Sequence, residues 1–130
     1  MPTALEMAHP LLGRAVMAIL DCRRGRDVVV IVGNDQQLRT ASRALAQALD
    51  ETHDAPVTIA RDGGEGDGAF AIIKAQGAGQ IRVLANMRHK ALQGLILDRV
   101  YLPSTRWRPD TSRLFAPNFA TRRESMLLVY

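Results

Sequence analysis

The chain has 130 residues, 47% of them hydrophobic, and a formal net charge of +4 at pH 7. This length suits one domain with a buried core, and the composition excludes a disordered chain. No apolar run is long enough to cross a bilayer, and Glu6 and Pro10 without a basic start argue against a secretory signal. The single cysteine, Cys22, excludes an internal disulfide and suits a reducing cytoplasm.

Helices and a buried strand are predicted in the first part of the chain. Thr3-Ala4-Leu5-Glu6 is a capping box that begins a helix, and Pro10 either breaks it or begins the next helix. That next helix ends at Arg23-Arg24-Gly25. Four apolar residues at helical spacing are predicted to form its buried face: Leu12, Val16, Ile19 and Leu20. The run Val28 to Val32 is β-branched and apolar on both faces, which is typical of a central parallel strand.

A third helix is predicted after the turn Gly33-Asn34-Asp35. Asn34 or Asp35 caps it, with Gln37 three residues after Asn34, and it ends near Asp50. Five apolar residues are predicted to form its buried stripe: Leu38, Ala41, Leu45, Ala48 and Leu49.

The second half of the chain is predicted to consist mostly of strands. A short strand spans Val57 to Ala60, and a glycine-rich acidic loop runs from Arg61 to Gly68. Phe70 to Lys74 and Ile81 to Ala85 are predicted to form a hairpin. One short helix and two strands are predicted beyond it: Asn86 to Gln93, Arg99 to Leu102, and Met126 to Tyr130.

These elements predict an α/β fold in one domain, residues 1–130. Helices and strands alternate early and a β-hairpin is inserted later. We therefore expect three layers, with a mainly parallel sheet and helices on both of its faces.

Motifs for familiar catalytic and metal sites are missing from the sequence. There is no G-x-x-x-x-G-K-[ST] phosphate loop, and the acidic loop lacks calcium-loop spacing. His9, His53 and His89 lack the spacing of metal ligands. We expect Asp98 to begin its strand and Cys22 to be a buried structural thiol, and we expect no cofactor or metal.

The positive charge is concentrated near the end of the chain. Residues 1–98 hold 11 basic and 11 acidic side chains, whereas residues 99–130 hold six arginines against Asp110 and Glu124. Fifteen of the 17 basic residues are arginine, whose planar fork suits phosphate. A GC-rich genome is the alternative explanation for the arginine excess.

Arginines flank an aromatic residue in Arg106-Trp107-Arg108. Such a ring can stack on a base while the arginines bind phosphates. In the alternative reading, Trp107 packs under its own loop and the arginines are solvated. Arg39 and Arg43, one helical turn apart, form a second basic patch. The residues predicted to bind nucleic acid are Arg106, Trp107, Arg108, Arg122, Arg123, Arg39 and Arg43.

The stretch Leu92-Gln93-Gly94-Leu95, followed by Asp98-Arg99-Val100-Tyr101-Leu102, has the pattern of a turn and strand that approach a Walker B motif. The strand Val28 to Val32 and the hairpin Phe70 to Ala85 precede it in a matching order. Over residues 10–104 the chain resembles, in incomplete form, the RecA-like ATPase core of helicases. The resemblance is greatest to the large terminase subunits that package viral DNA.

The resemblance implies a P-loop-like fold without its chemistry. The first strand and phosphate loop are missing, and the positions matching the Walker B acids are Pro103 and Ser104, which cannot hold magnesium. We therefore expect a non-catalytic, cytoplasmic, motor-like protein of viral or mobile-element type. Its expected partner is the phosphate backbone of nucleic acid or a larger motor or replication protein, with no membrane contact.

Two other functions stay open from the sequence. One is a protein-interaction module that mimics half of an ATPase and docks on a host or viral motor. The other is a small nucleotide-using enzyme that works through Asp98 or the acidic loop. Self-association into a homo-oligomer also stays open.

Overall fold

The computed structural model describes two helices and six strands, within residues 12–52, 57–62, 70–85, 97–103, 107–109, 115, 119 and 126–130. The helices are α2 (Leu12–Arg23) and α3 (Asp35–Thr52). The strands are β1 (Asp27–Val32), β2 (Val57–Asp62), β3 (Phe70–Ala75), β4 (Gln80–Ala85), β5 (Arg99–Leu102) and β6 (Met126–Val129).

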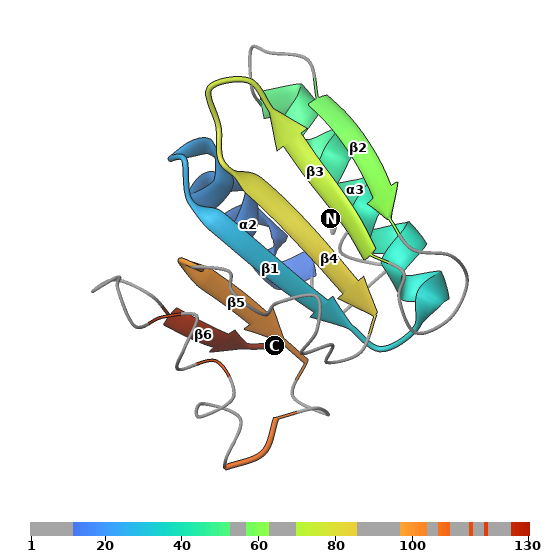
Figure 1. Cartoon of the computed structure of the whole chain (residues 1–130), viewed down its shortest axis with the longest axis vertical. Helices are drawn as coiled ribbons and strands as arrows, with labels where there is room; N and C mark the ends of the chain where they lie inside the picture. The colour runs from blue at the N-terminus through green and yellow to red at the C-terminus, as the bar shows by residue number, and fades with distance from the viewer. Residues whose placement is uncertain are drawn as a thin grey trace.

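All six strands form one sheet in the order β2-β3-β4-β1-β5-β6 (Figure 1). Strand β1 is central and runs parallel to both β4 and β5, and β5 runs parallel to β6. Strand β3 is antiparallel to both of its neighbours, β2 and β4. The α/β class and the mostly parallel sheet are confirmed, and the predicted hairpin is formed by β3 and β4.

Both described helices pack against the same face of the sheet, and in Figure 1 they lie behind it. Alternate residues of β1 face them, and their side chains share one core with residues of β3 and β4. Helix α3 lies over β2, β3 and β4, whereas α2 lies over β1 and β4. The helix side of this core includes Ala18, Ile19, Cys22, Leu38, Ala41, Leu45 and Leu49.

The opposite face of the sheet has a second apolar cluster. Val29 and Ile31 of β1 and Val100 of β5 pack there against Phe115, which is 1% exposed. The ring of Phe119 stacks on that of Phe115 with centroids 6.3 Å apart. The predicted arrangement of helices on both faces is not seen among the described residues, because α2 and α3 share one face. Burial on both faces explains the uninterrupted apolar run in β1.

Helix α2 ends in a Schellman motif built on Gly25, whose φ is 84°. The amide of Gly25 donates to the carbonyl of Cys22 at 3.0 Å, and that of Arg26 donates to Asp21 at 3.1 Å. The hairpin turn docks here, because the Gly79 amide donates to the Cys22 carbonyl at 2.7 Å. A Cβ on Gly79 would lie 2.0 Å from the Arg26 carbonyl oxygen, so only glycine fits.

One predicted core position is wrong. Leu20 keeps 43% of its surface exposed, whereas Ala18 and Cys22 of the same helix are fully buried. Ile19 is buried as expected, and Ala48 of α3 is only partly buried. The acidic loop predicted over 61–68 begins later than expected, because Arg61 and Asp62 belong to β2. The rest of that loop and the predicted helices at the N-terminus and at 86–93 lie outside the described residues.

Candidate nucleic-acid interface

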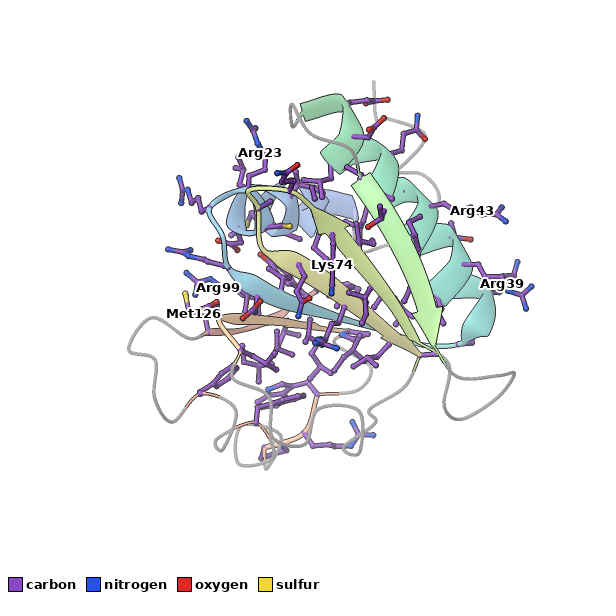
Figure 2. The ribbon with its side chains drawn as sticks, turned by 45° about the horizontal axis from the view of Figure 1, so that its top comes forward. Arg23, Arg39, Arg43, Lys74, Arg99 and Met126 are labelled. Carbon is purple, nitrogen blue, oxygen red and sulfur yellow. The ribbon has the colours of Figure 1, made fainter. Side chains whose placement is uncertain are left out.

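Arg39 and Arg43, called here the α3 pair, lie on the outer surface of helix α3. The helix is fixed in rotation because Leu38, Leu45 and Leu49 are buried against the sheet. With 3.6 residues per turn, positions 39 and 43 then fall on one flank, and both are exposed. Figure 2 shows both side chains projecting from the side of α3 that lies away from α2.

Helix α3 begins with Asp35, four residues before Arg39, and has both favourable and unfavourable charge spacings. Arg39 and Arg43 are like charges at i,i+4, a spacing that costs about 0.2–0.5 kcal/mol. The exposed acids Asp50 and Glu51 lie in the last turn, where the helix dipole disfavours them, and that turn holds no basic residue. Gln47, next along this surface, bonds Glu51 at 3.1 Å. Among the side chains that the structure describes, none forms an ion pair with Arg39 or Arg43. Such a pair suits an external anion.

Trp107 and Arg108 are the described part of the predicted Arg-Trp-Arg site. Trp107 keeps 42% of its surface exposed. Arg108 is exposed, and its Nη1 donates to the Trp107 carbonyl at 3.0 Å. Arg106, Arg122 and Arg123 lie outside the described residues.

The carboxyl ends of β1 and β5 are where an α/β sheet commonly binds ligands. At the start of α3, side chains of the protein itself accept hydrogen bonds from two backbone amides. The Gly33 amide donates to Gln37 Oε1 at 2.7 Å, and the Gln37 amide donates to Asn34 Oδ1 at 2.9 Å. These two bonds cap the start of α3.

Tyr130 joins the same two strand ends. Its amide donates to the Leu102 carbonyl at 2.9 Å, and its hydroxyl donates to the Ile31 carbonyl. Burial raises the pKa of this hydroxyl above its ordinary value. Pro103 follows β5 directly, and Ser104 lies outside the described residues.

The amino ends of the strands hold a buried polar cluster. Asp21 accepts from Arg26 at 2.7 Å and from the Tyr101 hydroxyl at 3.0 Å, and it lies 3.6 Å from Arg99 Nε. Asp98 Oδ2 accepts the Asp27 amide at 2.7 Å, and the Asp27 carbonyl accepts the Asp98 amide at 3.0 Å. Asp98 therefore aligns β1 with β5, as expected for a residue that begins its strand.

Cys22 is a structural thiol. It is fully buried, and burial, with a smaller contribution from the charge of Asp27, raises its pKa to about 11. A thiol with such a pKa is almost entirely protonated at neutral pH and is a poor nucleophile or metal ligand.

Two cations that were not among the residues predicted to bind nucleic acid lie on the sheet. Lys74 is exposed on β3 and Arg82 is half-buried on β4. The period-2 alternation of the two hairpin strands was the signal that could have found them, once their pairing register was known.

Comparisons with protein-family models, with curated proteins and with solved structures found no match to this chain. Within the described ranges, no helix is long and apolar enough to span a membrane, and no group of three or more His, Cys, Asp or Glu residues could hold a metal ion. What the fold defines is an α/β protein with a six-stranded, mostly parallel sheet.

Proposed function

We propose that this protein binds the phosphate backbone of nucleic acid and does not itself hydrolyse nucleotides. The observation that carries the proposal is the α3 pair: two exposed guanidinium groups on adjacent turns, without a carboxylate partner among the described side chains. The rise of 1.5 Å per residue separates them by about 6 Å along the helix axis. Two like charges held this close repel each other within the helix, whereas together they attract a polyanion.

The motor-like part of the proposal rests on the arrangement of the strands. A parallel β1–β5 pair and an inserted hairpin fit the resemblance to RecA-like and terminase cores. The proposed lack of nucleotide hydrolysis is supported by Pro103 at the position that the resemblance matches to the first Walker B acid. We propose a cytoplasmic protein of viral or mobile-element type that works beside a larger motor or replication protein.

The test replaces both residues of the α3 pair with glutamine. Binding to a fluorescein-labelled 20-base-pair duplex is followed by anisotropy over a range of salt concentrations. Because each lost contact to duplex phosphate lowers the slope of log K against log[salt] by about 0.9, we expect the slope to fall by about 1.8. The matched control is Arg23→Gln/Arg24→Gln, which removes the same charge from the exposed end of α2 and should leave the slope nearly unchanged.

The chain's single tryptophan supplies a second readout. If bases stack on Trp107, single-stranded DNA should quench its fluorescence, and Trp107→Ala should weaken binding by about 1–3 kcal/mol. No binding by the parent protein at 50 mM salt would overturn the proposal. The alternative of a module that docks on a motor protein would then account for the exposed cations.

A further inference from the structure

The second face of the sheet carries a pair of cations away from its apolar cluster. Phe115 packs over β1 and β5, and the cluster reaches β4 only at Leu84. Beyond this cluster, toward β2, Lys74 of β3 and Thr58 of β2 are exposed. Figure 2 shows Lys74 near the middle of the sheet, far from the α3 pair at the edge of the molecule. No described residue packs over this part of the face.

The strand register makes Lys74 and Arg82 neighbours. Lys74 of β3 pairs with Gln80 of β4, and Ile72 of β3 pairs with Arg82, so the two cations are diagonal neighbours on the same face. Diagonal positions are about 7–8 Å apart, within reach of long side chains. We call Lys74 and Arg82 the sheet pair.

The surroundings of the sheet pair are neutral or apolar. Arg82 of β4 is paired with the buried Val29 of β1 on one side and with Ile72 of β3 on the other. The stem of Arg82 therefore lies between apolar neighbours. Thr58 and Gln80, which flank Lys74, are uncharged. None of the side chains that the structure describes forms an ion pair with Lys74 or Arg82.

One acid lies in the same row of the sheet. Asp27 pairs with Gln80 and is therefore two strands from Lys74, about 10 Å at the usual strand spacing. The hydrogen bonds between Asp27 and Asp98 hold the backbone of Asp27 against β5, on the side away from β3. These contacts of the Asp27 backbone align β1 with β5.

The α3 pair and the sheet pair lie on opposite sides of the same sheet edge. Strand β2 is that edge, α3 covers β2 and β3 from one face, and Lys74 stands on β3 one strand in from the edge on the other face. The flank of α3 that carries Arg39 and Arg43 is the one away from α2, which is the β2 side (Figure 2).

A rigid duplex cannot contact both pairs. Double-stranded DNA has a persistence length of about 150 base pairs, so it does not turn around the edge of one small domain. A single strand bends freely and follows a charged path along a protein surface. We infer that this protein contacts single-stranded nucleic acid through both pairs, with the strand passing around the β2 edge from the α3 pair to the sheet pair, whereas a duplex contacts the α3 pair alone. This inference rests on the proposed function and extends it.

The experiment compares Lys74→Gln/Arg82→Gln with Arg39→Gln/Arg43→Gln on a 20-nucleotide single strand and on a 20-base-pair duplex. Glutamine keeps the stems and removes the charges. For the single strand, each lost phosphate contact lowers the salt slope by about 0.7, so either double variant should lower it by about 1.4. For the duplex, only the α3 variant should lower the slope. Gln80→Ala is the matched control on the sheet face, and circular dichroism checks that each variant is folded.

The outcomes separate the two proposals. A sheet-pair variant that lowers the single-strand slope and leaves the duplex slope unchanged supports the inference. A sheet-pair variant that changes neither slope, while the α3 variant changes both, overturns the inference and leaves the proposed function standing. If the sheet-pair variant lowers the salt slope on the single strand and on the duplex alike, the single-strand path is overturned. If neither variant changes either slope, both proposals fail.

Discussion

Replacing Asp21 with asparagine removes the carboxylate at the centre of the polar cluster. Its two oxygens both serve as acceptors, Oδ1 for Arg26 at 2.7 Å and Oδ2 for the Tyr101 hydroxyl at 3.0 Å, with Arg99 Nε 3.6 Å from Oδ2. An asparagine amide has one acceptor and one donor. In either orientation its NH₂ group therefore faces a donor, and the buried Arg99 loses its carboxylate partner.

We expect this change to lower the free energy of unfolding by about 3 kcal/mol. Removing one partner of a buried ion pair costs about 3–5 kcal/mol. The lower end applies because Arg99 Nη1 still donates to the Asp98 carbonyl at 2.9 Å. Arg26 contributes little to the loss, since its side chain is 25% exposed and can return to water.

A double-mutant cycle with Tyr101→Phe isolates the contact between the hydroxyl and the carboxylate. Alone, Tyr101→Phe should cost about 2 kcal/mol, because it removes a hydrogen bond to a charged acceptor and leaves a carboxylate oxygen underused. In the Asp21→Asn background its cost should fall to about 1 kcal/mol. The coupling energy of about 1 kcal/mol is typical of residues in one network.

Urea unfolding followed by circular dichroism at pH 7 measures these differences, with the m-value checked for constancy. The control is Asp50→Asn, which removes an exposed acid from the last turn of α3 and should change stability by no more than about 0.5 kcal/mol. The reasoning is refuted if Asp21→Asn costs under 1 kcal/mol, or if Tyr101→Phe costs the same in both backgrounds.

Three further outcomes follow from single contacts. Gly79→Ala should cost about 3 kcal/mol in urea unfolding, because its Cβ would lie 2.0 Å from backbone. Gly77→Ala, at φ 78° with open space around it, should cost about 1 kcal/mol, and equal costs would contradict the steric argument. Asn34→Ala should cost about 1 kcal/mol through the lost cap to Gln37, and no change would mean that the cap is replaced by water. Cys22, with its pKa raised to about 11, favours the folded state while it is protonated. Stability should therefore fall between pH 9 and 11, as the unfolded thiol ionises first, by at most about 1.4 kcal/mol per pH unit. In Cys22→Ala that fall should be shallower, and identical pH profiles would show that the thiol is not the cause.

The local elements were predictable because their signals are local. A β-branched run apolar on both faces predicted β1, and the Arg23-Arg24-Gly25 sequence predicted the end of α2. The asparagine and glutamine three residues apart predicted the start of α3, where both side chains bond the backbone. Each signal depends on a few neighbouring residues and on no contact with distant chain.

The error at Leu20 shows what pattern reading overlooks. Large apolar residues dominate a hydrophobicity pattern, so Leu20 was placed in the core with Ile19. The helix instead turns the small residues Ala18 and Cys22 to the sheet, and the Cys22 carbonyl also receives the Gly79 amide. Small side chains allow that close approach, and nothing in the sequence of the helix announces its distant neighbour.

The candidate site was only partly predictable, for a similar reason. The spacing of Arg39 and Arg43 on a helix is readable from sequence, because helical geometry is fixed. Lys74 and Arg82 become neighbours only through the register of β3 and β4, and a slip of one residue would send one of them to the other face. The sequence shows that Lys74 and Arg82 are present, but only the pairing of β3 with β4 shows that they are neighbours.

Four of the described arginines fall into two pairs with different surroundings. Arg26 and Arg99 are bound to Asp21 at the amino ends of the strands, where they help to hold α2 on the sheet. Arg39 and Arg43 stand on the solvent side of a helix whose core needs neither of them. Codon bias alone predicts scattered surface arginines, each free to be replaced by lysine or glutamine. The α3 pair lies beside a sheet edge that has the sheet pair on its other face, which is the arrangement that the proposed path of a single strand requires.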